Sequence, residues 1–192
     1  MKSHLLAAAA TCFGVALNAT AAPQTYVLDP SHTYPSFEAD HFGGVSTFRG
    51  KFKKTSGKLV INREARTGTI EATVDMSSVD IGLDALDADL KSSNFFDVAK
   101  YPTAVYKGGE FKFDGDVPVE VIGTLTLHGV TRPLNLKIQS FQCFFSGMLK
   151  RQVCGTESTA TFDRADFGMP AGKDYGFRMA TVLHIQAEGI LQ

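Results

Sequence analysis

Apolar and polar side chains alternate along most of this chain, and this feature limits the possible folds more than any other. In segment 36–41, for example, Phe37, Ala39 and His41 alternate with polar residues. The same period of two recurs in segments 47–52, 69–74, 111–114, 134–139 and 183–188. A period of two with one apolar face is typical of antiparallel strands whose other face is solvated. Because turn-forming residues separate the segments at regular spacing, the sequence predicts an all-β barrel or sandwich.

Small residues stand on several of the faces that are expected to point inward. Gly50 and Gly123 interrupt strand patterns, where glycine marks a bend, a bulge or the close approach of a ligand. Together with Ala39 and Ala72 they allow two interpretations. The small residues either leave the interior hollow or only relieve packing at barrel corners. In segment 119–127 the expected inward residues are Val119, Val121, Gly123, Leu125 and Leu127.

One short helix is predicted, and an apolar connection follows it. Leu83, Leu86 and Leu90 have the spacing of one helix face, but the pattern is too short to be stable alone. We therefore expect this helix to close one end of the barrel. Phe95 and Phe96 follow in the connection to the next strand and indicate that it covers an apolar surface, such as the mouth of a cavity. The alternative is ordinary packing of the helix against the barrel rim.

The first 21 residues are predicted to be a cleaved signal peptide. Lys2 precedes an apolar run, residues 5–17, that is short for a membrane span, and Ala19-Thr20-Ala21 fits the small-x-small cleavage rule. Residues 22–192 are then one exported domain, located in the periplasm or secreted. A retained membrane anchor is the alternative, and no other stretch is apolar enough to span a bilayer.

Export leaves two cysteines, Cys143 and Cys154, because Cys12 lies in the predicted signal. An even number of cysteines in an oxidising compartment favours one disulfide. It would close a loop of about 12 residues and contribute roughly 3 kcal/mol in the chain-entropy model. Two free thiols, or a thiolate metal or haem site, are the alternatives, although the spacing is not Cys-x-x-Cys and no histidine lies between the two.

Composition and motifs argue against several classes of function. The net charge of −1 does not predict a nucleic-acid-binding surface. The four histidines outside the predicted signal lie at positions 32, 41, 128 and 184, which is not a zinc-binding spacing. No nucleophile or phosphate-binding motif is present. We therefore expect no metal, no required cofactor and no enzymatic activity. The chain has fifteen Phe and no Trp, which favours apolar surface without polar groups to satisfy.

Several segments, in order, resemble the YceI-like family of lipid (polyisoprenoid)-binding proteins. Residues 26–32 are similar to its opening strand and Asp-x-x-His turn, and residues 123–134 to its Gly-Val-Thr-x-Pro hairpin. Residues 164–169 resemble its Arg-x-Asp-Phe-Gly turn, and residues 89–106 resemble its covering segment with an Asp-Phe-Phe-Asp-like turn. The resemblance extends from about Tyr26 to Leu191. Asp89 departs from it, since many members carry His there.

The resemblance implies an antiparallel, lipocalin-like β-barrel of about eight strands, with one short helix and the Phe-Phe turn covering one end. It implies that the barrel holds a long-chain isoprenoid or similar lipid, such as a quinone-like one, for transport, storage or stress response. Such a lipid is the expected partner, and a homodimer is a further expectation. Burial of a long tail gains about 25 cal/mol per Å² of apolar area, and a few polar contacts suffice for the head group.

The predicted ligand-binding residues lie on the apolar strand faces, in the helix and in the Phe-Phe turn. They are Phe37, Ala39, His41, Phe48, Phe52, Leu86, Leu90, Phe95 and Phe96. His41 would bond a lipid head group or, alternatively, a backbone group in the core.

Other polar residues are assigned to turns or to solvent. Asp29, Ser31 and His32 lie in a turn that Asp29 or Ser31 is expected to cap, and a contact at the cavity mouth or a catalytic pair is the alternative. Arg164 is expected to organise another turn. His128 is expected to be solvated. His184 is expected to face solvent or to pair with Glu188.

Two other functions are open from the sequence. The first is a redox or electron-transfer partner that binds a quinone or haem, with Cys143 and Cys154 redox-active. The second is an enzyme that uses the barrel as a reaction chamber and depends on His41 for turnover. No paired acid–base groups are visible in the sequence to support the second.

Overall fold

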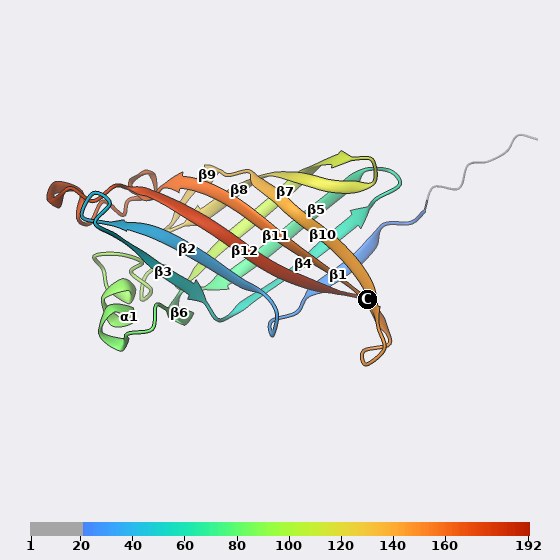
Figure 1. Ribbon diagram of the computed structural model, residues 1–192, viewed down its shortest axis with the longest axis horizontal. Coiled ribbons are helices and arrows are strands. Elements are labelled where there is room, and N and C mark those ends of the chain that lie inside the picture. The colour runs from blue at the N-terminus through green and yellow to red at the C-terminus, as the bar shows by residue number, and fades with distance from the viewer. Residues whose placement is uncertain (1–20) are drawn as a thin grey trace, which may run out of the picture.

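A computed structural model of the chain describes residues 21–192, and these form one β-barrel with a short helix at one end (Figure 1). The predicted signal peptide, residues 1–21, therefore lies almost entirely outside the described residues. The strands are β1 (Gln24–Leu28), β2 (Tyr34–His41), β3 (Ser46–Phe52), β4 (Thr55–Asn62), β5 (Thr67–Asp75), β6 (Val79–Asp80), β7 (Thr103–Asp114), β8 (Val117–Leu127), β9 (Val130–Pro133), β10 (Leu136–Ser146), β11 (Arg151–Asp163) and β12 (Ala180–Leu191). The helices are α1 (Asp84–Lys91) and three 3₁₀ turns, η1 (Met76–Ser78), η2 (Arg164–Phe167) and η3 (Lys173–Tyr175).

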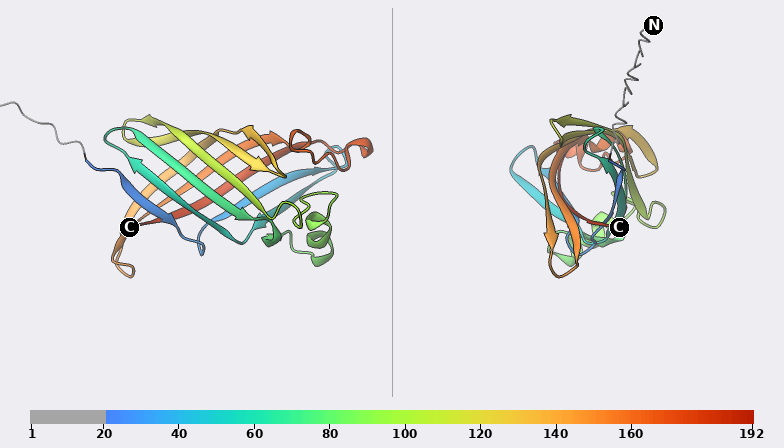
Figure 2. Two further views of the ribbon diagram at one scale, coloured as in Figure 1. Left: turned by 180° about the vertical axis from the view of Figure 1, so that it is seen from behind. Right: turned by 90° about the vertical axis from the view of Figure 1, so that its right-hand side faces the viewer.

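Eight of these strands close the barrel. They pair antiparallel in the order β1, β4, β5, β7, β8, β10, β11 and β12, and β12 pairs back with β1 through Val27 and Ile190. The end-on view in Figure 2 shows the ring. Closure satisfies the sheet edges that an open sheet would expose. This confirms the predicted lipocalin-like barrel of about eight strands.

The strands β2, β3 and β6 extend the wall at one end of the barrel. A turn at residues 29–33 separates β1 from β2, so β12 pairs with β1 near its C-terminus and with β2 through Thr181–Gln186. The β2–β3 hairpin and α1 then lie together at the end away from the C-terminus (Figure 1). In the described residues no helix is long and apolar enough to cross a membrane.

The predicted alternation is observed on most strands, with one correction on β8. Val119 was expected to point inward, but it is among the exposed apolar residues, and Pro118 is buried instead. The pairing of β7 with β8 shifts by one residue here, from Lys112 opposite Glu120 to Phe113 opposite Pro118. Such a bulge adds one residue to a strand and reverses the facing of the residues beyond it.

The interior has two apolar clusters that differ in character. The larger contains Phe37, Phe52 and Phe167 at the end that α1 covers, and it extends along the barrel to Phe111 and Val121 near the β7–β8 turn. The smaller fills the opposite end with Tyr26, Ile61 and Cys154. Tyr26 is only 1% exposed, and its hydroxyl donates a hydrogen bond of 2.6 Å to Gln152 Oε1. This second cluster closes the narrow end of the barrel, where both the described N-terminus and the C-terminus lie (Figure 1).

The predicted disulfide joins Cys143 to Cys154. The two residues are directly opposite each other on β10 and β11, and their sulfur atoms are 2.04 Å apart. The bond lies beside the narrow-end cluster, because Cys143 packs against Tyr26, Ile61 and Cys154. The free-thiol and thiolate-ligand alternatives are therefore not what the structure contains.

The two glycines that were predicted to interrupt strand patterns make room for aromatic rings. A Cβ atom on Gly50 would lie 2.6 Å from Phe37 Cζ, and one on Gly123 would lie 2.4 Å from the Tyr106 hydroxyl oxygen. These glycines therefore serve local packing, as one of the two interpretations held. Ala39 and Ala72, in contrast, line open space, which supports the other interpretation at their positions.

Gly50→Ala is expected to destabilise the fold by about 1–3 kcal/mol, because the added methyl group overlaps the Phe37 ring and the Ile81 side chain. The matched control is Gly155→Ala on β11, where the nearest heavy atom to an added Cβ is 3.5 Å away. This control is expected to be neutral or slightly stabilising, since alanine has less freedom than glycine in the unfolded chain. Urea unfolding of both variants tests this, and equal midpoints would contradict it.

Candidate functional site

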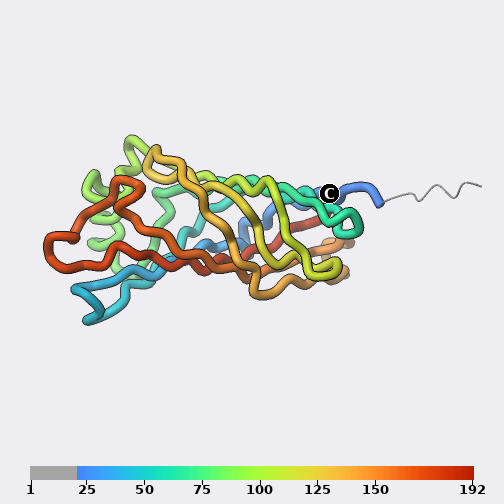
Figure 3. Tube along the Cα trace, turned by 90° about the horizontal axis from the view of Figure 1, so that it is seen from above, coloured from blue at the N-terminus to red at the C-terminus, as the bar shows by residue number. Residues whose placement is uncertain are grey.

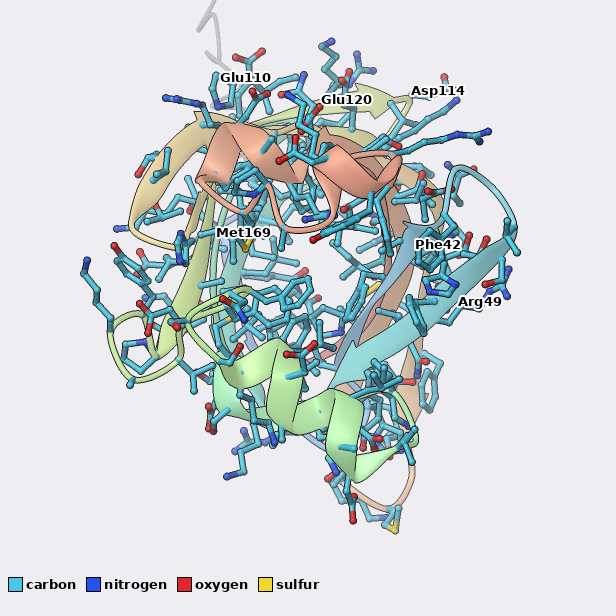
Figure 4. The ribbon with its side chains drawn as sticks, turned by 90° about the vertical axis from the view of Figure 1, so that its left-hand side faces the viewer. Phe42, Arg49, Glu110, Asp114, Glu120 and Met169 are labelled. Atoms are coloured by element: carbon cyan, nitrogen blue, oxygen red, sulfur yellow. A yellow bond between two sulfur atoms is a disulfide. The ribbon has the colours of Figure 1, made fainter. Side chains whose placement is uncertain are left out.

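A cavity of about 240 Å³ lies inside the barrel at the end covered by α1. It reaches from Leu28 and Thr33 near the β1–β2 turn to Asp40 and Phe177 at the opening. On β12 its lining runs from Thr181 to Ala187, which corresponds to ~20 Å along the strand. Figure 4 looks into this end, with α1 along one side of the opening and Met169 and Phe42 near its rim. The site is therefore a deep pocket rather than a surface groove.

The lining is almost wholly apolar. It is formed by inward side chains of the strands, by α1 and by the connection after α1. Of the predicted ligand-binding residues, all but His41 contribute: Phe37, Ala39, Phe48, Phe52, Leu86, Leu90, Phe95 and Phe96. The sequence thus located the lining of the cavity, while contact of these residues with a ligand stays a prediction.

The Phe-Phe turn both lines the cavity and packs against the barrel. The Phe96 ring lies 5.6 Å from the Phe52 ring and 6.4 Å from the Phe37 ring, between centroids. Backbone hydrogen bonds fix the turn to the end of α1, with Phe96 N–H donating to Leu90 O and Asp97 N–H to Ser92 O. The two readings of this segment are therefore compatible, because the same rings close the rim and face the cavity.

His41 lies outside the cavity, which corrects the inward position expected for it. Its Nδ1 is 3.1 Å from the exposed Ser46 Oγ, and its ring packs edge-on against Phe48 and Phe42. His41 is the last residue of β2, where the chain turns into the hairpin and alternation no longer fixes the side-chain direction. Its hydrogen-bond partner is the Ser46 hydroxyl and not a backbone group in the core, while a contact with a head group stays a prediction.

Few polar residues line the cavity, and two of them at the mouth were not predicted from the sequence to do so. Asp40 was expected to point outward, yet it lines the opening, as does Arg164. The Arg164 guanidinium donates to Met169 O at 2.6 Å and to Ala171 O at 2.5 Å. Burial lowers the pKa of Arg164, while Asp163 and Asp40 oppose that shift. The expected role of Arg164 in organising a turn is confirmed, and the same side chain borders the cavity.

The chain matches known proteins over most of its length. The family model described as YceI-like domain matches residues 26–188. A UPF0312 protein of Vibrio cholerae is 31% identical over 176 residues, covering 88% of this chain and 89% of the relative. A UPF0312 protein of Shewanella denitrificans is 31% identical over 202 residues, covering all of both chains.

The chain belongs to the YceI-like family.

Solved structures support the YceI-like fold at low sequence identity. BcnA of Burkholderia cenocepacia has a TM-score of 0.67 at 17% identity, covering 84% of this chain and 98% of that one. A polyisoprenoid-binding domain from Saccharophagus degradans has a TM-score of 0.64 at 19% identity, covering 87% and 98%. At these identities the likeness concerns the fold.

The mouth of this YceI-like barrel is held together by Arg178. Asp40 Oδ2 accepts hydrogen bonds from the backbone N–H groups of Gly43 and Arg178, at 2.8 and 2.9 Å. The Arg178 side chain donates to Gly43 O at 2.8 Å. These bonds join the β2–β3 hairpin to the segment after η3, and the two segments lie side by side in Figure 3. They form what we call the rim clamp, Asp40, Gly43 and Arg178.

Breaking the rim clamp is expected to loosen the mouth without unfolding the barrel. In Arg178→Ala, amide hydrogen exchange of residues 41–46 and 172–178 should accelerate about tenfold, because the side-chain bond to Gly43 O is lost. The control is Arg49→Ala, which removes an ion pair of 2.9 Å with Glu38 on the outer wall. Equal exchange in both variants would contradict a clamp at the mouth.

The clamp should also respond to acid. The backbone hydrogen bond from Arg178, with weaker help from Gly43 and the Arg178 charge, holds the pKa of Asp40 below its usual value. A carboxyl with a lowered folded pKa contributes stability above its unfolded pKa, about 3.9. That contribution is lost as the pH falls through the lowered folded pKa. The hydrogen bonds of the rim clamp are therefore expected to stay formed at neutral pH and to weaken only below about pH 4.

Two other histidines differ from expectation. His128 is half-buried rather than solvated, with Nδ1 3.1 Å from Phe167 O and its ring on Tyr101, because the β8–β9 hairpin packs against η2. His184 is half-exposed, as expected, and its Nε2 is 3.8 Å from Glu38 rather than near Glu188. Residues four apart on one strand are ~13 Å apart, whereas β2 lies directly beside β12.

Asp29, Ser31 and His32 form the predicted turn cap. Asp29 accepts hydrogen bonds of 2.8 Å from Ser31 N–H and from His32 Nδ1. The hydrogen bond that His32 donates to Asp29 raises the pKa of His32. Potential ligand atoms of Asp29, His32 and Glu188 lie within 4.8 Å of one another, so this turn is where the described residues could hold a metal ion. It is an exposed turn outside the cavity, and its hydrogen bonds already explain its geometry.

Proposed function

We propose that this YceI-like protein binds a long-chain isoprenoid or similar lipid, with the tail in the barrel cavity and the head group at the mouth. The observation that carries the proposal is the deep cavity lined almost wholly by apolar side chains. Each Å² of tail buried there gains about 25 cal/mol, so no catalytic or metal group is required for affinity. The Saccharophagus degradans neighbour, described as a polyisoprenoid-binding domain, supports this ligand class.

The charges at the mouth favour a neutral head group over a phosphorylated one. The charged lining residues there are Asp40, Asp89 and Arg164, two carboxylates and one guanidinium. Asp89 stands where many family members carry His, so this chain has an added negative charge at that point. A diphosphate would be repelled by the carboxylates, whereas a quinone-like ring could accept hydrogen bonds from Arg164. We therefore place a quinone-like isoprenoid first among the candidate ligands.

An exported location fits this proposal. The disulfide between Cys143 and Cys154 is typical of oxidising compartments, such as the periplasm or the outside of the cell. The N-terminal sequence predicts a signal peptide for the same destination. Transport, storage and a role in stress response all fit a carrier in that location.

The alternatives have less support from the geometry. Cys143 and Cys154 lie at the narrow end and do not line the cavity, so a redox role would have to act at a distance from the bound lipid. Among the described residues that line the cavity there is no histidine or cysteine. The Asp40 carboxylate already accepts the hydrogen bonds of the rim clamp. A reaction chamber would need an acid–base pair facing the ligand.

Mass spectrometry of organic extracts tests the proposal. The protein should be purified without detergent from the compartment to which its native host exports it, and a stoichiometric long-chain lipid is expected in the extract. A second extraction after incubation with isoprenoid quinone and with isoprenyl diphosphate should recover the quinone in excess. A clean extract in every case would exclude the lipid-binding role, and preferential recovery of the diphosphate would exclude only the neutral head group.

A further inference from the structure

The β10–β11 hairpin extends beyond the barrel at the narrow end. Strand β10 pairs with β8 only at Leu136 and Lys137, and β11 starts to pair with β12 at Val153. Residues 144–151, which we call the hairpin tip, therefore project as a two-stranded ribbon past the neighbouring strands. Figure 1 shows it below the C-terminus, at the opposite end of the long axis from α1, and Figure 2 shows the same projection from behind.

The hairpin tip exposes large apolar side chains on both of its faces. Phe144, Phe145 and Met148 are 60%, 67% and 89% exposed, and Leu149 is also exposed. Adjacent residues of a strand point to opposite faces, so Phe144 and Phe145 cannot be covered by one flat partner. Large exposed apolar groups of this kind mark an interaction site. An environment that surrounds the tip suits it better than one that covers a single side.

The charge next to these residues is positive. Lys150 and Arg151 follow directly, and residues 140–156 contain no acidic side chain. Arg151 donates to Leu191 O at 3.3 Å, which leaves its charge in place, and within residues 21–192 neither side chain forms an ion pair with a carboxylate. Aromatic and methionine side chains bordered by cations match the apolar boundary and anionic head groups of a bilayer.

The disulfide holds the tip in a fixed shape. An isolated two-stranded ribbon is only marginally stable in water. The bond between Cys143 and Cys154 crosses the ribbon immediately before Phe144, where the barrel no longer supports β10. The tip is therefore presented already ordered, which lowers the entropic cost of docking.

We propose that the hairpin tip inserts into the surface of an anionic phospholipid bilayer. The cavity mouth lies at the opposite end of the barrel, so a docked molecule would direct its mouth away from that bilayer. This site is separate from the cavity and does not require a lipid inside the barrel. Both sides of the ribbon would contact acyl chains, while Lys150 and Arg151 would remain at the level of the head groups.

Vesicle co-sedimentation of the exported chain tests the proposal. Binding is expected to vesicles of phosphatidylcholine mixed with phosphatidylglycerol, to be much weaker with phosphatidylcholine alone, and to fall with added salt. Phe144→Ser with Phe145→Ser should weaken binding about tenfold or more. Lys150→Gln should weaken binding only to the anionic vesicles. The matched control is Phe42→Ser with Val45→Ser, an exposed apolar pair at the mouth that is 51% and 79% exposed.

Several outcomes would overturn the proposal. They are an absence of vesicle binding, binding that the tip variant retains, or binding that the mouth variant loses to the same extent. Concentration-dependent self-association that only the tip variant abolishes, without vesicle binding, would assign the tip to a second copy of the chain instead. Lipid extracted from the same variants reports on the cavity separately, so failure of the tip proposal and failure of the proposed function are distinguishable. Unchanged thermal unfolding of each variant shows that it is folded.

Discussion

Ala72→Phe is expected to reduce the lipid recovered with the protein at least tenfold. Ala72 lies on β5 and lines the cavity, so a phenyl ring there would occupy the space in which a tail is proposed to lie. The same ring fills a void rather than a packed core, so the unliganded protein should gain about 1 kcal/mol of stability. Loss of ligand together with gain of stability separates a blocked site from a damaged fold.

The control for this variant is Thr73→Phe. Thr73 is the next residue on β5 and is not part of the lining, so its side chain points to the outer wall. It adds the same ring and should leave lipid content unchanged. Extraction followed by mass spectrometry gives the lipid content, and urea unfolding gives the stability. Equal lipid content in Ala72→Phe and the unmodified chain would show that a ligand does not use this cavity.

Tyr26→Ala is expected to cost about 3–5 kcal/mol of unfolding free energy, the largest stability effect that we predict. The Tyr26 ring fills the narrow end beside Ile61 and Cys154, and its hydroxyl is bonded to Gln152. Alanine would leave a void and an unpaired amide oxygen on Gln152. Guanidinium unfolding measures the loss, and the midpoint should fall sharply while the slope is unchanged.

Two further variants serve as controls for Tyr26→Ala. Tyr175→Ala makes the same change at a side chain that is 77% exposed and should cost less than about 0.5 kcal/mol. Tyr26→Phe keeps the ring and removes only the hydroxyl, so it should cost about 1 kcal/mol. If Tyr26→Ala resembled Tyr175→Ala, the narrow end would not be filled as described.

The barrel and most of the cavity lining could be predicted because strand geometry imposes a period of two. Once Phe37 and Ala39 are on the inner face, so are the other inward residues of the same unbroken strand. Prediction failed where that period breaks. At Val119 a bulge reverses the facing, and at His41 the strand ends. Both events have a local signal that the alternation outweighed: Gly43-Gly44 follows the end of β2, and Pro118 lies beside Val119.

Contacts between segments that are distant in the chain could not be predicted from the sequence either. Arg178 reaches Asp40, and His184 lies near Glu38, only because β2 folds beside β12. Strand order is set by the whole chain, so a local pattern does not identify such partners. The rim clamp was therefore missed, although the nearby Arg164 turn was recognised. The hollow interior was similarly undecided, since alanine and glycine fit both a filled and an open barrel.

The filled narrow end makes the barrel a tube that is closed at one end. Tyr26 and Ile61 fill the far side, so the proposed lipid would enter tail first and leave head first through the same mouth. The partner that supplies the lipid and the partner that receives it would then have to contact the same opening in turn, because a second lipid molecule cannot push the first one through. The filled end also limits the length of tail that the cavity can bury, because further isoprene units would remain outside once the tail reaches it. Affinity should rise with chain length up to that depth and then level off.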